Sequence, residues 1–572
     1  MTLTKNWQTE SLITPEADEE LQAFPPLFRQ LLFNRGYASD KSARSFIKAK
    51  VSCDTSPWKL TGMDKAIDRI VHAINFHEPI IIYGDFDVDG VTATALMVDV
   101  LRSLNANVEP YIPNRFDEGY GLNIDALDKI HQDGCKVVVT VDCGIRSVEE
   151  VKHAGNIGLD IIISDHHNPG DHLPEAYAVI NPKQPGDQYP DKDLAGVGVA
   201  FKIANALLEK FPDSSMKSDK LLDLVALGTV ADLASLTGEN RRLVRMGLHQ
   251  LRQTSRQGLF SLANVAGLEL KNCTAGDIGY MLGPRLNASG RLESALASYE
   301  LLTTQDIQLA GQLAQKLENQ NQKRRQITRE TQDKAENLVT QQDTDSYLLF
   351  AADPDFNPGV VGLAASRLSE KFYRPAIVCT IEDNSTRGSC RSIPEFHITD
   401  ALDQCADLLV RYGGHAAAAG FTVLNKNLEN FKERLNSIAK EKLSELDLHP
   451  TLCADLELSL SELNATVLDQ LLWFEPTGYG NPETVFVSRG VQVLSKRAVG
   501  KVGSHLKLIV TDGYSKFDAI GFNLGHYLPE LTKTIDIMYT FEMNDFNDRQ
   551  TLQLRLKDIK ILGKTENKAN LN

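Results

Sequence analysis

The segment PIIIYGDFDVDG (79–90) places a short apolar run directly before three alternating aspartates. Residues 79–84 have the composition of a buried strand, and VTATALMVDVLRSL (91–104) has that of a helix following it. Two more apolar runs, KVVVTV (136–141) and LDIIIS (159–164), also lie between helical segments and end in acidic or small residues. Such runs predict a parallel sheet covered on both faces. In these sheets, ligands bind at the carboxyl ends of the strands.

Aspartates and histidines gather where these predicted strands end. Three aspartates follow the first strand, VDCG (141–144) closes the second, SDHH (164–167) closes the third, and ALGTVADLASL (226–236) is interpreted as a fourth such end. If the ends share one edge of a sheet, their carboxylates and imidazoles converge there. Each segment alone is also explained by turn chemistry or by an aspartate that caps a helix. Four such ends in order favour a functional site.

The chemistry of this set predicts divalent cations. Carboxylates crowded this closely are costly unless a cation neutralises them. Carboxylates with one or two histidines suit Mn²⁺ or Mg²⁺, whereas structural zinc sites favour cysteine and histidine. An EF-hand calcium loop is excluded, because Leu96 occupies the twelfth position in place of glutamate and a strand precedes the loop. Two cations about 4 Å apart are a common device for hydrolysing phosphate esters.

The composition is that of a soluble globular protein with several domains. Hydrophobic residues make up 42% and charged residues 24% of the 572 residues, and no apolar run reaches the roughly 18 residues of a membrane helix. The eight cysteines include no CxxC pair, which argues against a zinc ribbon and a disulfide framework and favours the cytoplasm. The net charge of −16 argues against nucleic acid, although bound metals neutralise carboxylates and a basic groove can lie on an acidic protein.

The patterning predicts an α/β fold with five segments. Residues 1–60 form a helical extension, and 61–300 form the unit with the parallel sheet. Residues 301–342 contain one long polar helix that bridges two domains. A second α/β domain spans 343–445, and short strands of alternating polarity predict a small all-β domain over 446–565.

Taken together, these segments resemble the DHH phosphoesterase superfamily, named for Asp-His-His. The matching motifs are GDFDVDG (84–90), VDCG (141–144), SDHH (164–167) and GTVADL (228–233). The second α/β domain carries GGHAAAAG (413–420), which resembles the glycine-rich signature of the DHH-associated domain. By its residues alone, this last motif is equally explained as a tight loop that opens a helix.

Within that superfamily the chain resembles the RecJ family of bacterial single-strand exonucleases. The motifs that carry this resemblance are YIPNRFDEGYGLN (111–123), LAGVGVAFK (194–202), LGPRLNASGRL (282–292), GVVGLAASRL (359–368), GSCRSI (388–393) and FEPTGYGNPE (474–483). One departure is Asn357, preceded by Phe356, where the family often has Trp-His. The contact of that histidine near the substrate is missing here or is supplied by another residue.

The resemblance implies a parallel-sheet DHH domain, a bridging helix, a DHH-associated α/β domain and a C-terminal OB-fold-like domain that binds single strands. It implies a 5′-to-3′ exonuclease specific for single-stranded DNA, which uses two Mn²⁺ or Mg²⁺ ions, releases 5′-mononucleotides and acts in DNA repair and recombination. A single-stranded-DNA-binding protein and a recombination helicase are the implied partners, with no membrane. The alternatives are a phosphodiesterase of cyclic dinucleotides or very short RNA, and a binding protein with an inactive site.

The resemblance also assigns roles to residues of the strand ends. The implied metal ligands are Asp85, Asp87, Asp89, Asp142, His166 and Asp232. The implied catalytic residues are Asp87, Asp89, Asp142, His166, His167 and Asp232. Within this set His167 is expected to contact the scissile phosphate. Asp165 is expected to orient a ligand imidazole.

Phosphate contacts are expected outside the strand ends. The implied residues are Arg115, Arg285, Arg291, Ser389, Arg391 and His415. Three of them, Arg115, Ser389 and Arg391, are expected to hold the 5′ phosphate, the last two from a turn of small residues. Any of these arginines could equally form a surface ion pair. Gly413 and Gly414 would let the backbone approach the substrate closely. In the all-β domain, candidates for single-strand binding are Lys496, Arg497, Lys501, Lys507, Tyr479 and Phe522.

Overall fold

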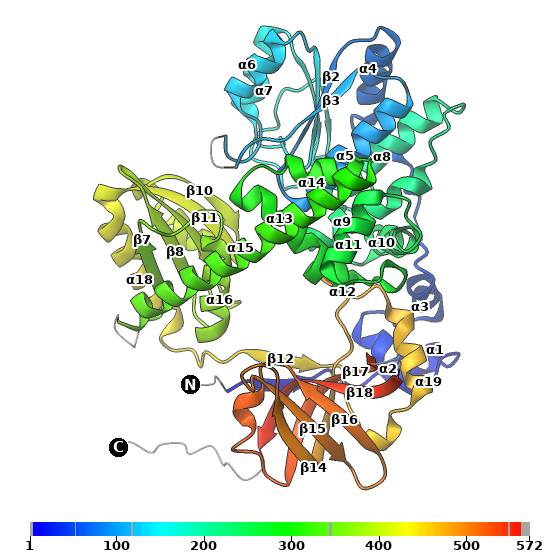
Figure 1. The fold of residues 1–572 in the computed structure, drawn as a ribbon, viewed down its shortest axis with the longest axis vertical. Coiled ribbons are helices and arrows are strands. Elements are labelled where there is room, and N and C mark those ends of the chain that lie inside the picture. Colours follow the sequence, from blue (N-terminus) through cyan, green and yellow to red (C-terminus); the bar gives the residue numbers. More distant parts are fainter. Residues whose placement is uncertain (1–3, 52, 116–117, 342–345, 547–548, 562–572) are drawn as a thin grey trace.

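The computed structural model describes most of the chain (Figure 1). The described residues are 4–51, 53–115, 118–341, 346–546 and 549–561. Phe116 and Asp117 of one quoted motif, and the predicted domain ends at 343–345 and 562–565, lie outside these ranges. In the part of the chain that is described, no helix is long and apolar enough to cross a membrane.

A five-stranded parallel sheet forms the first unit and confirms the predicted fold. Its strand order is β3-β2-β4-β5-β6. The strands are β2 (Ile80–Gly84), β3 (Val108–Tyr111), β4 (Val137–Val141), β5 (Asp160–Ser164) and β6 (Ala178–Ile180). Val137 and Val139 of β4 pack in one core with α4, α5 and α8, whereas Val138 packs in another core with α6 and α7. These helices are α4 (Met63–Asn75), α5 (Val88–Ser103), α6 (Ile124–Gln132), α7 (Val148–Ile157) and α8 (Gly196–Lys210).

The segment 226–236 is helical, which corrects its interpretation as a strand end. Residues Leu222–Ala231 form α9, and all of its residues from Leu222 to Val230 are buried. A helix that is apolar on all sides loses the periodicity that distinguishes it from a buried strand. Further helices continue this unit: α10 (Gly238–Leu251), α11 (Gln257–Ala266), α12 (Ala275–Asp277), α13 (Gly283–Leu292) and α14 (Leu296–Thr303).

One helix of 34 residues, α15 (Ile307–Thr340), connects the first unit to the second (Figure 1). Leu313 and Leu317 in its first half are buried in the core of the first unit. Ala335 and Val339 in its second half belong to a core of the second unit. The predicted bridging helix is therefore present, and each half is stabilised by burial against a different unit.

The second unit is a mixed sheet of strand order β10-β11-β9-β8-β7. Its strands are β7 (Leu349–Asp353), β8 (Ala376–Ile381), β9 (Ser385–Arg391), β10 (Leu409–His415) and β11 (Ala418–Leu424). Its helices are α16 (Val361–Phe372), α17 (Ile398–Asp403) and α18 (Leu428–Leu443). One expectation needs correction, because Ser389 and Arg391 lie in strand β9 rather than in a turn. GGHAAAAG forms the β10–β11 hairpin, which excludes the alternative that it opens a helix.

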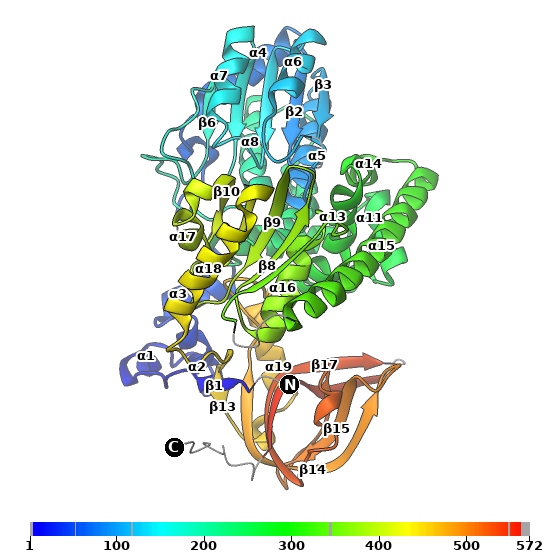
Figure 2. The ribbon, with the colours of Figure 1, turned by 90° about the vertical axis from the view of Figure 1, so that its left-hand side faces the viewer.

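The C-terminal unit is a closed five-stranded barrel, as predicted for an OB-fold. The barrel runs β14-β15-β16-β18-β17, and β17 pairs back with β14. The strands are β14 (Phe486–Val499), β15 (His505–Thr511), β16 (Lys516–Gly521), β17 (Thr534–Phe546) and β18 (Arg549–Ile561). Shorter elements precede it: β12 (Thr451–Ala454), β13 (Leu456–Glu457) and α19 (Ala465–Leu471). The barrel lies at the end of the molecule opposite the parallel sheet (Figure 2).

The N-terminal helices pack on the C-terminal barrel, although hundreds of residues separate them in sequence. Phe28 and Leu31 share a core with Phe474 and Phe541. Strand β1 (Asn6–Thr9) also pairs in parallel with β12. The helices are α1 (Pro15–Glu20), α2 (Pro26–Asn34) and α3 (Asp40–Ile47).

Buried Arg241 of α10 fixes this C-terminal assembly to the first unit. Its guanidinium donates to the carbonyls of Phe474 and Pro476, at 2.8 and 3.1 Å, and of Phe46, at 3.1 Å. A guanidinium satisfied by several main-chain carbonyls holds these segments in one fixed geometry.

Candidate active site

The acids that follow β2 are fixed by the helix that begins there. Asp87 caps α5 and accepts hydrogen bonds from the backbone N–H groups of Asp89 and Gly90, at 2.9 and 3.2 Å. Asp89 is buried in the first turn and accepts from the N–H groups of Gly196 and Val197, at 2.7 and 2.8 Å. The N-terminus of α8 therefore stabilises the Asp89 carboxylate from the side opposite its own helix.

Asp142 occupies a strained backbone position directly after β4. Its φ is +64°, in the left-handed region that few residues other than glycine adopt. Such strain persists where the surrounding structure fixes a functional side chain. Gly196 packs against that side chain, because a Cβ atom there would lie 2.5 Å from Asp142 Oδ1. Gly228 has the same role for Asp89, whose Oδ1 would lie 2.7 Å from a Cβ atom.

These two glycines are functional positions that the sequence analysis missed. Gly196 belongs to the motif LAGVGVAFK and lies in the first turn of α8. Gly228 belongs to the motif GTVADL and lies within α9. A glycine inside a helical pattern is the signal that could have revealed them, because it costs stability unless close packing requires it.

The two histidines after β5 have different surroundings. His167 Nδ1 lies 2.7 Å from Asp165 Oδ1, and both Asp165 oxygens also accept backbone N–H groups. Asp165 thus orients His167, whereas His166 is free to point toward the other acids. Burial alone would lower the pKa of His167, but its hydrogen bond with Asp165 raises it. Burial alone would raise the pKa of Asp165, but the same hydrogen bond lowers it.

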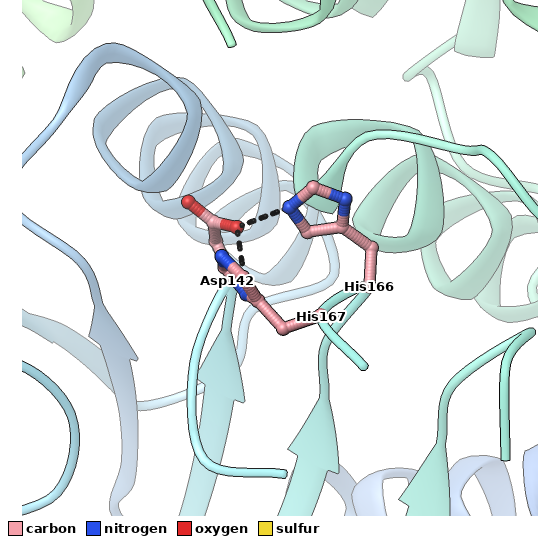
Figure 3. A group of neighbouring side chains, drawn as sticks. All are labelled: Asp142, His166 and His167. Atoms are coloured by element: carbon pink, nitrogen blue, oxygen red, sulfur yellow. Dashed lines mark ion pairs between the residues drawn. The ribbon is translucent and has the colours of Figure 1, made fainter. Parts of the chain in front are cut away.

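His166 is the meeting point of three acids from three elements. Its Nε2 lies 3.1 Å from Asp142 Oδ1, 3.9 Å from Asp89 Oδ2 and 3.8 Å from Asp232 Oδ2. Asp232 reaches this point from the C-terminal end of α9. Figure 3 shows both histidines directed at the same carboxylate oxygen of Asp142. The structure therefore brings together the acids and imidazoles predicted at the strand ends.

The ligand atoms form three overlapping groups, and within each group the atoms lie within 4.8 Å of one another. They are Asp142 with His166 and His167, Asp89 with His166 and Asp232, and Asp85 with Asp87 and Asp142. Asp142 and His166 each belong to two of the groups, and of the two only Asp142 has a second oxygen with which it could serve two cations.

Crowding of like charges shifts the pKa values of these groups. Burial and the charges of Asp89 and Asp87 raise the pKa of Asp142 well above its usual range. Burial and the charge of Asp87 raise the pKa of Asp89 to about 7 and that of Asp85 to about 8. Burial and the charge of Asp89 raise that of Asp232 to about 9. Burial lowers the pKa of His166 to about 3, which keeps its imidazole neutral, as a metal ligand must be.

Buried ligand atoms without partners test whether divalent cations fit. Asp142 Oδ1, Asp85 Oδ1 and His166 Nε2 are buried, and none has a hydrogen-bond partner among the described residues. Unsatisfied buried polar atoms are rare, and a bound ion is one explanation for them. Carboxylates with imidazole are the donor set that Mn²⁺ and Mg²⁺ accept. The residues fit these cations.

Arginines lie next to this acidic cluster. Arg115 stacks on Phe86, with its Cζ 3.9 Å from the ring centroid. Burial lowers its pKa against the opposing charges of Asp85 and Asp87. Arg291 is also desolvated, because burial and the charge of Arg115 lower its pKa to about 10. Arg291 also contacts the second unit, where its guanidinium donates to the Gly359 carbonyl at 3.3 Å.

The second unit contributes Ser389 and Arg391 to the same region. Arg391 donates to Ser389 Oγ at 3.1 Å and to the carbonyl of Cys390 at 2.7 Å. Burial lowers its pKa, so this charge also lacks full solvation. Gly362 of α16 faces both side chains, because a Cβ atom there would lie 2.9 Å from Ser389 Oγ and 3.2 Å from Arg391 Nη2.

Other predicted phosphate contacts divide into two groups. His415 lies near the tip of the β10–β11 hairpin. Burial lowers the pKa of His415, and the nearby charges of Arg146 and His167 lower it further. Gly414 in this hairpin has φ +152°, and a Cβ atom would lie 2.4 Å from the Ala418 carbonyl. Arg285 is occupied elsewhere, because it pairs with Glu318 of α15 at 2.6 Å with both side chains largely buried. The expected phosphate contact of Arg285 is thus replaced by an ion pair between two helices.

Two further residues need comment. Asn357 accepts a hydrogen bond from the Gly359 N–H at 2.8 Å and so stabilises its own loop before α16.

Tyr120 was missed by the sequence analysis, although it lies in the quoted motif EGYG. Its hydroxyl lies 3.2 Å from His167 Nδ1, while 56% of the residue is exposed. An aromatic ring placed so beside the acids can contact a nucleotide base.

The residues predicted to bind single strands in the C-terminal unit differ in their exposure to solvent. Phe522 and Tyr479 are 55% and 68% exposed. Lys507 pairs with Asp518 at 3.4 Å, and Lys496 donates to the carbonyl of Leu531 at 2.9 Å. Arg497 and Lys501 are exposed on β14 and on the turn after it. The two aromatic residues, Arg497 and Lys501 are therefore accessible, whereas Lys496 and Lys507 already have partners.

Comparison with known proteins places this arrangement in a family. Residues 79–229 match the DHH family N-terminal domain, 345–441 match the DHHA1 domain, and 454–558 match the RecJ OB domain. The chain is 40% identical over 537 residues to the single-stranded-DNA-specific exonuclease RecJ of Bacillus subtilis, covering 93% of this chain and 68% of that protein. It is 36% identical over 560 residues to the Escherichia coli protein of the same name, covering 94% and 96%.

Solved structures agree. The fold matches RecJ from Thermus thermophilus in complex with Mn²⁺, with a TM-score of 0.83 and 28% identity, covering 97% of this chain and 79% of that one. A structure of exonuclease RecJ bound to manganese is 33% identical, with a TM-score of 0.59, covering 68% of this chain and 98% of that one. On these grounds the chain belongs to the RecJ family of the DHH superfamily.

Proposed function

We propose that this protein is an exonuclease that degrades single-stranded DNA from the 5′ end by two-metal catalysis and releases 5′-mononucleotides. The observation that carries the proposal is that desolvated arginines supplied by two units lie next to a buried carboxylate–imidazole cluster. The relatives named as single-stranded-DNA-specific exonucleases support the choice of substrate.

The cations would be held by the cluster around Asp142. Asp85, Asp87, Asp89, Asp142, His166 and Asp232 would be their ligands. When bound, the two ions neutralise the carboxylates, activate a water molecule and stabilise the charge of the scissile phosphate.

His167 acts on the substrate. Its raised pKa, maintained by Asp165, keeps a proton on the ring for donation to a non-bridging phosphate oxygen. Water adds to phosphorus in line with the 3′ oxygen, the P–O3′ bond breaks, and a proton is transferred to the departing 3′ oxygen. The first nucleotide leaves with its own 5′ phosphate.

End recognition follows from the arginines. Arg391, Ser389 and Arg115 would hold the terminal 5′ phosphate, and they are supported by an Arg391–Ser389 hydrogen bond and by the stacking of Arg115 on Phe86. Because the bond to O3′ breaks, the shortened strand again carries a 5′ phosphate, and the same contacts apply in each cycle. The guanidinium fork suits this role, since it binds phosphate through two parallel hydrogen bonds.

The barrel would hold the strand downstream of the cut. Its exposed aromatic residues offer stacking surfaces for bases, as in other OB-folds. We further place the enzyme in cytoplasmic DNA repair and recombination, with a single-stranded-DNA-binding protein and a recombination helicase as partners.

Hydrolysis of cyclic dinucleotides or very short RNA is the second candidate. The barrel favours the exonuclease, because a small substrate needs no surface beyond the two α/β units. Turnover should be measured with Mn²⁺ on single-stranded DNA, duplex DNA, a cyclic dinucleotide and a dinucleotide of RNA. We expect rapid release of mononucleotides from single-stranded DNA alone, loss of it in EDTA, and restoration by Mn²⁺ or Mg²⁺ better than by Zn²⁺. Faster hydrolysis of the cyclic dinucleotide would contradict the proposal.

A further inference from the structure

A cavity lined by arginines lies between α15 and α16, outside the residues assigned above. Its volume is about 420 Å³, and it is lined by Arg324, Arg325, Thr328, Ser366, Arg367 and Glu370, with one leucine. That volume falls within the range of about 300–1,000 Å³ typical of small-ligand sites. Three guanidinium groups and one carboxylate leave the cavity with an excess of positive charge.

The three arginines lack the carboxylate partners that arginines usually find in this acidic protein. Among the residues that the structure describes, none of the three forms an ion pair, and the Arg325 guanidinium forms no hydrogen bond. Arg367 donates only one long hydrogen bond, to Gln332 Oε1 at 3.4 Å. Arg324 makes one contact, to Asn321 Oδ1 at 2.9 Å, and its Nε is buried without a partner. Glu370 lines the cavity without pairing with any of them.

This arrangement is unfavourable as it stands. Burial lowers the pKa of Arg324, and the charges of Arg325 and Arg367 lower it further. Like charges gathered around a hollow repel one another unless an anion lies between them. A phosphate group supplies several acceptor oxygens and the opposite charge, which is the combination that unpaired guanidinium groups bind best.

The cavity adjoins the predicted 5′-phosphate site. Gly362 faces Ser389 and Arg391, and Ser366, one turn further along α16, lines the cavity and donates to the Gly362 carbonyl at 3.2 Å. On the other side, Arg291 is close enough to both Arg115 and Arg324 for each charge to affect its pKa. The basic groups therefore continue from the carboxylate cluster, through Arg291, to the cavity.

We propose that the cavity between α15 and α16 is a second phosphate-binding site, which accepts phosphate groups beyond the 5′-terminal one. The position beyond the end of the strand rests on the proposed function, because it assumes that Ser389 and Arg391 hold the terminal phosphate. Two sources supply this chemistry: the outer phosphates of a 5′-triphosphate end, and free inorganic phosphate or polyphosphate.

Calorimetric titration with tripolyphosphate tests the site directly. The full-length protein is used in EDTA at constant ionic strength, in an Arg391→Ala background that removes the neighbouring phosphate contact. We expect binding to persist in Arg391→Ala and to weaken by at least about tenfold when Arg325→Ala and Arg367→Ala are added. Arg329→Ala, an exposed arginine of α15 that does not line the cavity, is the control and should change nothing.

Two results would overturn the proposal: tripolyphosphate binding that is unchanged by the cavity substitutions, or an equal loss in the Arg329 control. Thermal unfolding of each variant shows whether the fold survives. Comparing 5′-triphosphorylated with 5′-monophosphorylated oligonucleotides shows whether the bound phosphate groups come from a strand end or from a free anion. Tighter binding of the triphosphate that disappears in Arg325→Ala/Arg367→Ala identifies the strand end, whereas equal binding identifies the free anion. Failure of the proposed function is seen separately, as insensitivity of Arg391→Ala to the 5′ phosphate.

Discussion

Two clusters of like charges lie side by side in this protein. One is the carboxylate cluster at the ends of β2, β4 and β5, and the other is the arginine group beside it. Each crowds like charges into a poorly solvated space and leaves part of their bonding capacity unused. The carboxylates have raised pKa values, and the arginines have lowered ones. Neither group neutralises the other, since the arginines adjoin the acids at their edge without pairing with them.

The difference lies in what each group lacks. Three overlapping sets of acids and imidazoles have the geometry to hold a cation, whereas the guanidinium groups suit an anion with several acceptor oxygens. Cations and a phosphate chain together would satisfy both regions at once. Stability is thus sacrificed on both sides for the binding of ligands, as is expected where function sets the charges.

The largest effect should follow from removing a bridging acid. Asp142→Ala should lower turnover of single-stranded DNA roughly thousandfold, because the lost cations contribute several kcal/mol to transition-state stabilisation. Asp232→Ala should behave similarly, with binding of single-stranded DNA largely kept. The control is Asp125→Ala, exposed on α6. Near-normal turnover of either variant would show that the metal assignment is wrong.

A smaller and more selective effect is expected on the arginine side. Arg391→Ala should reduce degradation of 5′-phosphorylated strands by about 10- to 100-fold, the value of a charged hydrogen bond, with little effect on 5′-hydroxyl strands. Arg387→Ala is the matched control, since Arg387 lies on the same strand and pairs with Glu382. Equal losses on the two substrates would indicate a general or structural role for Arg391.

The barrel should contribute affinity instead of chemistry. Because the N-terminal helices share its core, deleting the barrel would expose their apolar faces, and a point substitution is the cleaner test. Phe522→Ala should weaken binding of a long single strand about tenfold, since stacking on one base contributes about 1–3 kcal/mol. Hydrolysis of a dinucleotide should not change. Phe76→Ala, an exposed phenylalanine of the first unit, serves as control. Unchanged affinity for the long strand would show that Phe522 does not contact the bound DNA.

The smallest effect concerns the pH dependence of stability. Asp89, Asp85 and Asp232 have pKa values of about 7, 8 and 9 in the folded protein, above the ordinary aspartate value. The folded state therefore binds more protons than the unfolded state, and the free energy of unfolding must fall as pH rises through this range. In EDTA, Tm should fall steadily between pH 5 and pH 9.

Mg²⁺ should abolish most of that fall, because a bound cation replaces the proton. Asp232→Asn in EDTA should show a shallower fall than the wild-type protein, since one of the titrating carboxyl groups is gone. A Tm that rises from pH 5 to pH 9 in EDTA would have the wrong sign for this account of the acids.

The sequence was sufficient for β2, β4 and β5, because each is a separate apolar run that ends in a chemically distinctive residue. It did not reveal the two edge strands, since β3 reads VEPY and β6 has only three residues. It also gave the wrong element before Asp232, because the apolar run of α9 carries no periodicity to separate helix from strand. The packing of Phe28 against Phe541 could not be foreseen either, because pairing across the length of the chain leaves no local signal.

Contacts between side chains were the hardest to predict. Arg285 and Arg291 lie in one motif six residues apart, yet one pairs with Glu318 and the other extends toward the acids. Only the position of α15 relative to α13 decides between these outcomes. Similarly, the hairpin of GGHAAAAG depends on its pairing with β9, which no spacing of glycines reveals.

We propose that hydrolysis begins at the 5′ end, where the arginines hold the terminal phosphate beside the carboxylate cluster. A single strand labelled at its 5′ phosphate and digested with Mn²⁺ tests this polarity. We expect the label to appear as a mononucleotide from the earliest time points, while the remaining long strands are unlabelled. Label retained on a ladder of progressively shorter strands would show digestion from the 3′ end instead.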